Sequence, residues 1–242
     1  MIGGLATRDV DVRELMDDPD CDRRMLERTY DRFAAVNAVV SRPGAIYRRD
    51  IRPRTSKDRP LRILDIGAGG GDLCRVIARR MRRDRRPAEI TALDADERAI
   101  SWASAHDQGA GVRYMHATTH ELVAAGEQFD VIVSNHVLHH LTDAELQAVL
   151  ADSRRLLSPG GLIVHHDIAR GRAAYVLFSI ATALLGGNLL AGSFIRTDGL
   201  ISIRRSYTVA EIAAAAPEGW VARGRFPFRI ELRRQDDSAA RR

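Results

Sequence analysis

The sequence predicts an α/β protein in which a mostly parallel sheet carries helices on both faces. Short apolar runs alternate with helical segments from residue 61 onward, and short connections join them, as in βαβ units. The run Phe129–Ser134, FDVIVS, is mostly apolar and has three β-branched residues in succession, which is typical of a strand buried on both faces. A third observation is the glycine-rich turn between the first of these strands and a helix.

Seven strands are expected, five in the alternating part and two near the end of the chain. In order they are Leu61–Ile66, Glu89–Leu93, Val112–Met115, Phe129–Ser134, Gly161–His166, Trp220–Arg225 and Phe228–Leu232. Helices are expected where apolar residues recur at helical spacing: Asp72–Arg83, Asp96–His106, Thr142–Leu157 and Thr208–Ala216. Proline and glycine separate these elements, as in the turn Ser158-Pro159-Gly160-Gly161.

The first part of the chain, residues 1–60, is expected to be an appendage to a main domain of residues 61–242. Residues 1–22 are acidic and are expected to be loosely ordered. Residues 23–40 have helical spacing, and Pro43 with Gly44 ends that helix. Residues 50–60 are charged and contain proline, so a linker is expected there.

Charge and cysteine content narrow the class of partner. The net charge is +5, and the basic residues are arginines apart from Lys57. The arginine clusters lack interleaved aromatic residues, so we interpret them as solvated faces and expect no nucleic-acid partner. Cys21 and Cys74 do not make a disulfide framework. Charges interrupt the N-terminal segment before an apolar core forms, which argues against a secretory signal, and a cytoplasmic location is expected.

The segment Leu61–Leu73, LRILDIGAGGGDL, carries the main functional signal. Glycines in a strand–turn–helix junction let the backbone approach a ligand closely. A dinucleotide site would need glycine at the position of Asp72, where we expect a helix N-cap instead. Acidic residues around the turn also disfavour a pyrophosphate and favour a cationic ligand, so an oxidoreductase is the weaker alternative.

The pattern Asp65, Gly67, Gly69, Gly71 resembles motif I of the class I S-adenosylmethionine-dependent methyltransferases. The resemblance extends from Leu61 to Asp167 through FDVIVSNHVLHHLTDAE and LLSPGGLIVHHD. It implies a Rossmann-like fold with an N-terminal lid helix, and S-adenosylmethionine as cofactor with S-adenosylhomocysteine as product. The cofactor residues it implies are Asp65, Gly67, Ala68, Gly69, Asp94, Ala95, Ala117, Thr118, Asn135 and His136.

One departure from the family pattern concerns adenine. Many members place an acid after the third strand, but this chain has Ala117 and Thr118 there. We therefore expect the backbone or Thr118 to contact the adenine. The acid at the end of the second strand is present as Asp94, where it would accept both ribose hydroxyls.

Histidines near the ends of the fourth and fifth strands are candidates for a general base. Histidine titrates near neutrality and can take a proton from an acidic hydroxyl. We expect His139 or His166, with Asp167, to be catalytic, and a structural role is the alternative for His139. His165 and His166 are adjacent on a strand and point to opposite faces, so we expect no metal site there.

The stretch Ala173–Ile195 carries no charged residue. It is long enough to cross a bilayer, which needs about 20 apolar residues. However, Gly186-Gly187-Asn188 interrupts it, and it lies between strands of one sheet. We expect an apolar helical cap of two short helices, at about 171–200, over the acceptor pocket. The candidate lining residues are Tyr175, Phe178, Leu184, Leu189 and Phe194. Docking on a membrane surface is the second interpretation.

The sequence therefore predicts methyl transfer to a hydrophobic small molecule. O-methylation of a phenolic, polyketide or quinone-like hydroxyl is favoured over C-methylation of a quinone or lipid. The segment FIRTDGLISIRRSYTVAEI is also similar to a subgroup encoded beside type III polyketide synthases. A non-catalytic binder of the cofactor and an RNA-directed protein remain as alternatives of another class.

Overall fold

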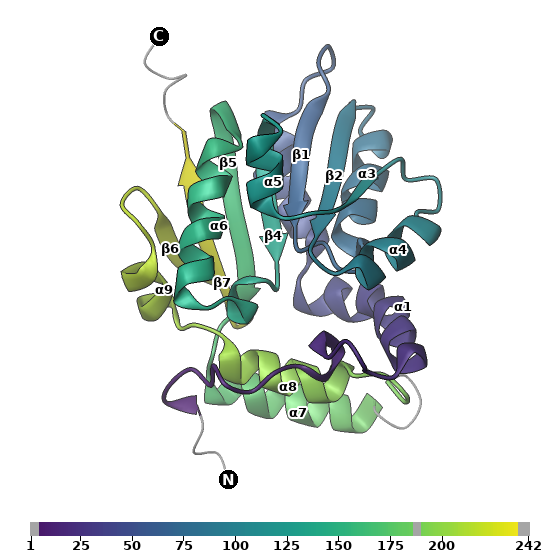
Figure 1. Ribbon diagram of the computed structural model, residues 1–242, viewed down its shortest axis with the longest axis vertical. Helices are drawn as coiled ribbons and strands as arrows, with labels where there is room; N and C mark the ends of the chain where they lie inside the picture. Colours follow the sequence, from purple (N-terminus) through teal and green to yellow (C-terminus); the bar gives the residue numbers. More distant parts are fainter. Residues whose placement is uncertain (1–4, 186–189, 237–242) are drawn as a thin grey trace.

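One seven-stranded sheet forms the centre of the protein, with helices on both faces (Figure 1). A computed structural model describes residues 5–185 and 190–236. The strand order is β3-β2-β1-β4-β5-β7-β6. β7 runs antiparallel to β5 and to β6, and the other neighbouring pairs are parallel. The strands are β1 (Leu61–Ile66), β2 (Ala88–Asp94), β3 (Arg113–His116), β4 (Phe129–Asn135), β5 (Leu157–Ile168), β6 (Val221–Arg225) and β7 (Arg229–Gln235).

All seven predicted strands are present, with one notable shift. β5 begins at Leu157, so the Ser-Pro-Gly-Gly segment lies inside the strand and not before it. A register shift against β4 between Phe129 and Val131 accommodates that segment. The strand order reverses between β1 and β4, and ligands of open α/β sheets bind at such a reversal, beyond the carboxyl ends of the strands.

Helices cover the sheet where the hydrophobic spacing predicted them. They are α3 (Asp72–Arg83), α4 (Glu97–Ala105), α6 (Asp143–Arg155) and α9 (Val209–Ala215), with an additional α5 (Thr119–Ala124). The prediction that Asp72 caps α3 was wrong by one residue. Gly71, at φ 73°, is the N-cap, and Asp72 is the first helical residue. Only a residue that tolerates positive φ suits this sharp entry into the helix.

The expected linker at 50–60 is helical in its first part. After α1 (Arg23–Val40), the chain forms α2 (Pro43–Ile46) and the short helical turns η3 (Tyr47–Ile51) and η4 (Arg52–Arg54). Asp50 and Ile51 are fully buried there. Asp50 accepts hydrogen bonds from Arg49 and from Arg233 of β7, so this segment is bound to the sheet.

The cap consists of α7 (Arg172–Leu185) and α8 (Ile195–Arg205), which lie side by side beyond the carboxyl ends of the strands (Figure 1). The predicted interruption, at Gly186-Gly187-Asn188, lies outside the described residues. The second helix starts only at Ile195, so the cap reaches Arg205 and not residue 200. Among the described residues, no helix is long and apolar enough to span a bilayer.

Residues 5–22, which we call the N-terminal strap, were expected to be loosely ordered, and this expectation was wrong. The strap crosses the cap beside α8 (Figure 1). The Asp9 amide donates to the Arg204 carbonyl, and the Leu15 amide donates to Asp198, so the strap runs antiparallel to α8. These bonds to a distant helix fix a segment whose own sequence has little helical or strand character.

Candidate active site

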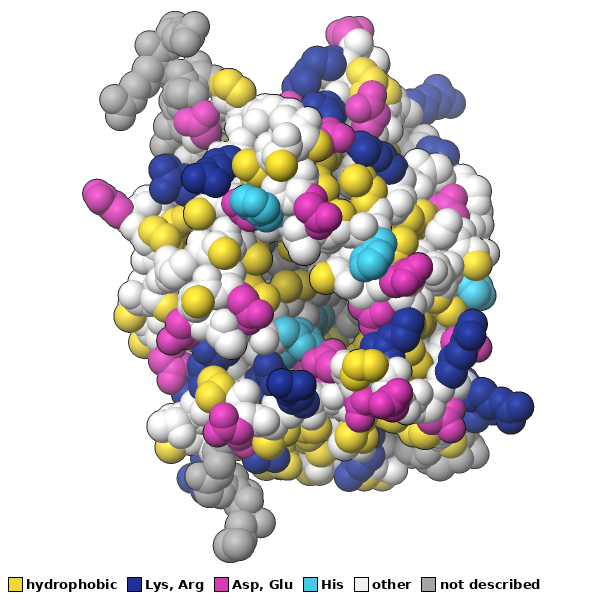
Figure 2. All heavy atoms as spheres, viewed as in Figure 1, with side chains coloured by type: hydrophobic (Ala, Val, Ile, Leu, Met, Phe, Trp, Pro, Cys, Tyr) yellow, Lys and Arg dark blue, Asp and Glu magenta, His cyan; other side chains and the backbone are white. Residues whose placement is uncertain are grey.

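A cavity of about 1140 Å³ lies at the carboxyl edge of the sheet. The ends of β1, β2 and β4 form one wall, α1 and the strap form a second, and α8 with Phe178 of α7 forms a third. The face shown in Figure 2 is hollowed at its centre, with hydrophobic side chains and a histidine in the hollow. All ten residues predicted for cofactor binding line this cavity.

The glycine turn between β1 and α3 forms one end of the cavity. Gly67 has φ 66°, and a Cβ there would collide with Val137. Gly69 has φ 51°, and nothing lies within 4 Å of where its Cβ would be. The amide of Gly69 donates to Asp94 Oδ2 at 2.7 Å. This hydrogen bond therefore fixes the glycine turn to the end of β2.

Asp65 is an unusual carboxylate at this end of the cavity. It is 1% exposed, and its Oδ1 has no hydrogen-bond partner among the described residues. Its Oδ2 accepts from the Cys74 thiol at 3.3 Å. Burial raises the pKa of Asp65 to about 8 and also raises the pKa of Asp94. A cation bound between these acids would favour their ionised forms, so this end of the cavity suits a positively charged ligand.

Ala68, Ala95, Ala117 and Thr118 also line the cavity. The Thr118 hydroxyl donates to Glu121 and accepts from the Glu121 amide, which makes it the N-cap of α5. Because this capping box engages the hydroxyl, it is not free to bind adenine. Of the two contacts expected from the sequence, the backbone contact is the one that the geometry leaves open.

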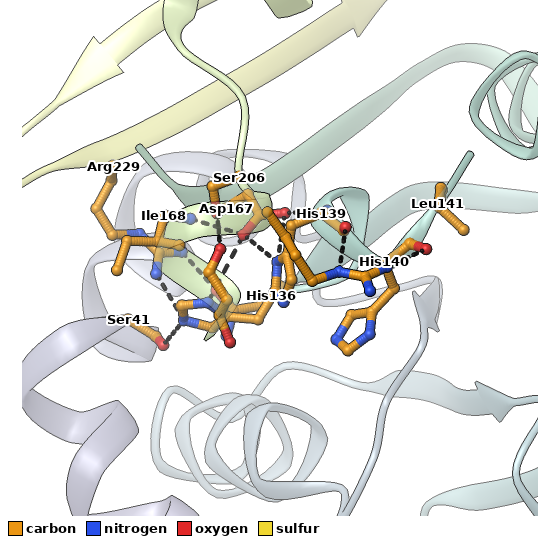
Figure 3. A network of polar contacts seen from close by, with 12 residues as sticks. Ser41, His136, His139, His140, Leu141, Asp167, Ile168, Ser206 and Arg229 are labelled. Atoms are coloured by element: carbon orange, nitrogen blue, oxygen red, sulfur yellow. Dashed lines mark hydrogen bonds and ion pairs between the residues drawn. The ribbon is translucent and has the colours of Figure 1, made fainter. Parts of the chain in front are cut away.

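Asn135 and His136 stand where β4 ends. His136 has φ 61°, and its Nε2 accepts from Arg229 at 2.8 Å and lies 2.8 Å from Ser41 Oγ (Figure 3). Arg229 also donates to Asn135 Oδ1. Burial and the neighbouring guanidinium lower the pKa of His136 to about 3. His136 is therefore neutral at physiological pH and keeps the loop after β4 in place.

His139, in the short helix η5 (Leu138–His140), lies between two carboxylates. Its Nδ1 is 2.8 Å from Asp167 Oδ1, and its amide donates to Asp167 Oδ2 (Figure 3). Its Nε2 lies 3.1 Å from Oε1 of Glu14, in the strap. Burial alone would lower the pKa of His139, but the two carboxylates raise it to about 10.

Glu14 is a site residue that the sequence analysis missed. It is 5% exposed and lines the cavity. The Ser202 hydroxyl of α8 donates to its Oε1 at 2.6 Å, and His140 Nε2 lies 3.8 Å from that oxygen. Burial would raise the pKa of Glu14, but His140 and His139 lower it to about 2.

His165 and His166 point to opposite sheet faces, as the strand geometry predicts, but neither lines the cavity. Ser134 Oγ lies 2.8 Å from His165 Nδ1. His166 Nε2 lies 3.5 Å from Asp50, within the ion pairs that bind η3 to β7. This position gives His166 no access to a ligand in the cavity, so the structure offers no support for His166 as a base.

The topology, the glycine turn and the acid at the end of β2 together define the class of protein: a nucleoside-binding α/β domain of the methyltransferase type. Residues 63–161 match the family model described as a methyltransferase domain. This part of the chain is thus similar to the methyltransferase domains of the class I, S-adenosylmethionine-dependent family.

Curated relatives are similar over about half of the chain. The ubiquinone biosynthesis O-methyltransferase of Maricaulis maris is 36% identical over 144 residues, which are 57% of this chain and 54% of the relative. The protein of the same name from Roseobacter denitrificans is 40% identical over 119 residues, which are 48% and 45% of the two chains. The chain thus spans about half the length of the curated relatives it matches.

Solved structures share the fold over a larger part of the chain. The plantazolicin methyltransferase BpumL in complex with SAH has a TM-score of 0.60 at 16% identity, covering 92% of each chain. An O-methyltransferase family protein from Burkholderia thailandensis has a TM-score of 0.57 at 15% identity, covering 85% of this chain and 57% of that one. At these identities the likeness concerns the fold.

Proposed function

We propose that this protein transfers a methyl group from S-adenosylmethionine to a hydroxyl group of a hydrophobic small molecule, phenolic or quinone-like. The observation that carries the proposal is the arrangement at the glycine turn. Asp65 offers a buried carboxylate oxygen without a partner, and Asp94 faces the same cavity. Two acids beside an open glycine backbone suit a ligand that carries positive charge and ribose hydroxyls.

The residues at this end fit the cofactor in a specific arrangement. Asp65 and the backbone at Gly67 and Gly69 would hold the methionine end, and Asp94 would accept the ribose hydroxyls. The backbone at Ala117 and Thr118 would contact the adenine. When bound, S-adenosylmethionine supplies an activated methyl group, and the protein has to align the acceptor with it and exclude water.

The other end of the cavity fits an apolar acceptor with one polar group. The apolar side chains there include Met16, Phe33, Val36, Phe178 and Ile195. Of the candidates from the cap, Phe178 reaches the cavity, whereas Leu184 is 82% exposed and Leu189 lies outside the described residues. The names of the curated relatives also favour a quinone-like acceptor over a polyketide.

His139 is the proposed base. Asp167 accepts from the His139 amide and lies 2.8 Å from Nδ1, which leaves Nε2 on the side of Glu14, a residue that lines the cavity. A phenol has an ordinary pKa of about 10 and needs help to lose its proton near neutrality. In its neutral form, His139 would take the acceptor's hydroxyl proton on Nε2, and Asp167 would stabilise the imidazolium that results.

The exposed apolar side of α7 is proposed to contact a membrane surface. Val176, Leu177, Ile180 and Leu184 are exposed and lie along one side of α7. An acceptor with a long apolar tail resides in a bilayer, so a cap that touches the bilayer would receive it there. Co-sedimentation with anionic vesicles tests this contact, and Leu177→Asp combined with Ile180→Asp should abolish it.

The proposal is tested by calorimetry and by product analysis. Micromolar binding of S-adenosylmethionine and S-adenosylhomocysteine is expected, with no binding of NAD. Incubation with 4-hexylcatechol as a probe acceptor should give a product one methyl group heavier. NMR of that product separates O-methylation from C-methylation. Cofactor binding without turnover on a panel of phenols and quinols would favour the non-catalytic alternative.

A further inference from the structure

The contact between Glu14 and His139 has a consequence for the reaction, if the proposed function holds. Glu14 Oε1 lies 3.1 Å from Nε2 of His139, and both residues line the cavity. The other ring nitrogen is bound to Asp167. With both nitrogens engaged by carboxylates, His139 has no free position from which to accept a proton from an acceptor molecule.

We infer that Glu14 is a positioning residue that holds Nε2 of His139 until the hydroxyl group of the acceptor displaces it. Glu14 Oε1 then marks where the acceptor oxygen sits in the occupied site. Once Glu14 has moved away and the resting Nε2 proton has passed to solvent, the acceptor's O–H bond would break and its proton would pass to Nε2. The acceptor oxygen would form the new bond to the methyl carbon as the carbon–sulfur bond of the cofactor breaks, with S-adenosylhomocysteine as the leaving group. The N-terminal strap thereby closes the acceptor end of the cavity whenever the acceptor is absent.

Contacts of the strap backbone place Glu14 beside His139, and these contacts do not depend on the Glu14 side chain. Asp198 of α8 accepts from the amides of Leu15 and Met16, at 2.9 and 3.1 Å, directly after Glu14. Burial raises the pKa of Asp198 to about 6. Other strap contacts include Arg98, which donates to the carbonyls of Met16 and Asp18. On the other side of Glu14, Arg205 donates to the Val12 carbonyl. The backbone is therefore held before and after Glu14, while the Glu14 side chain contacts mainly groups of the cavity.

Two carboxylates and three nitrogen-bearing side chains lie around His139. Glu14 reaches it from the strap, Asp167 from β5, His136 from the end of β4 and His140 from η5. Arg205 of α8 donates to the His139 carbonyl. The two carboxylates favour the imidazolium, and burial opposes it. Removal of the charge on Glu14 alone therefore makes His139 easier to deprotonate.

The first test is an NMR titration of the histidine rings in the whole protein, with the His139 signal identified by its loss in His139→Gln. In the unaltered protein His139 should stay protonated to about pH 9. In Glu14→Gln, which keeps the size of the side chain, the midpoint should fall by at least one pH unit. Asp11→Asn is the matched control, because it removes an exposed carboxylate from the same strap and should leave the midpoint unchanged.

The second test uses kinetics with 4-hexylcatechol as the probe. In Glu14→Gln the acidic limb of kcat/KM should move to lower pH by the same amount, about tenfold in kcat/KM at pH 7 for each unit. The rise in kcat/KM should come from a lower KM with kcat unchanged, because competition with Glu14 ends once the acceptor is bound. A merely structural role would lower kcat and leave the pH profile in place.

Failure of the inference is distinct from failure of the proposed function. If the unaltered protein turns over the probe, but Glu14→Gln changes neither the His139 midpoint nor the pH profile, Glu14 does not control the base. If the unaltered protein neither binds S-adenosylmethionine nor methylates any acceptor, the proposed function fails, and the NMR titration still tests the contact. Should Glu14→Gln fail to fold, Asp198→Asn loosens the strap and should move the midpoint in the same direction.

Discussion

The two ends of the cavity are built in different ways. At the cofactor end, Asp65, Gly67, Gly69 and Asp94 lie within 30 residues of one another and are positioned by adjacent parallel strands. At the acceptor end, Glu14, His139, Asp167 and Ser202 come from the strap, η5, β5 and α8. The first end is a property of a local motif, and the second exists only when distant parts of the chain come together.

The comparison predicts separable losses, and the largest concerns the acceptor end. In His139→Gln, turnover should fall by about 10²- to 10⁴-fold, as expected for loss of a general base. The cofactor should still bind within about twofold, because no cofactor residue is altered. Calorimetry and a methyl-transfer assay on one preparation measure both quantities.

His166→Gln is the matched comparison for His139→Gln. His166 lies outside the cavity, so the folded protein should keep its turnover while the free energy of unfolding decreases. If turnover in this variant falls as far as in His139→Gln, the assignment of the base to His139 is wrong.

The next largest effect concerns the cofactor end. Asp94→Ala removes the acceptor for the Gly69 amide and for the ribose hydroxyls. Hydrogen bonds to a charged group contribute about 1.5–3 kcal/mol each, so the Kd for S-adenosylhomocysteine should rise by at least about tenfold. Asp58→Asn, at an exposed position, provides the control. An unchanged Kd for S-adenosylhomocysteine in Asp94→Ala would contradict the assignment of Asp94 to the cofactor site.

A smaller effect separates two glycines of the same turn. Gly67→Ala would push a methyl group into Val137, whereas Gly69→Ala faces open space, and both positions have positive φ. Strain from positive φ costs about 1–2 kcal/mol in either variant, and Gly67→Ala adds a steric cost. Thermal unfolding should show Gly67→Ala as the less stable variant, with partial recovery when Val137→Ala is added.

The last prediction concerns the pH dependence of stability, where the change for each pH unit is small. The folded-state pKa of His139 is raised to about 10 from an ordinary 6.5, so its contribution is fully present below about pH 6.5 and is lost as pH rises towards 10. Urea unfolding should show a decline in stability between pH 7 and 10, of at most about 1.4 kcal/mol per pH unit for this proton. The slope should be shallower in His139→Gln, and equal slopes would contradict the ion-pair geometry.

The residues of the proposed cofactor end could be predicted from the sequence because they form a local pattern. A strand, a glycine turn and an acid at the end of the next strand are readable as a pattern, and the parallel sheet brings them together without further information. The strands were also predictable, since burial on both faces requires continuous apolar runs such as β4.

The acceptor end was only partly predictable. His139 and Asp167 stood out by residue type, but His166 has the same type and lies outside the cavity. Glu14 gave no signal, because an acid in an acidic segment looks like any solvated residue, and its contact with His139 spans 125 positions. The helical nature of residues 50–54 was hidden for the same reason: the pairing of Asp50 with Arg233 depends on the tertiary structure.

The antiparallel course of the strap along α8 also orders events during synthesis. Strap residues 9–15 bond to residues 198–204, so these contacts span more than 180 positions. Contacts of such sequence separation form late, because a long loop must close first. While the chain is being made, the glycine turn and β2 leave the ribosome long before α8. A nascent chain can thus complete its cofactor end first, and the strap closes the acceptor end only after α8 has emerged.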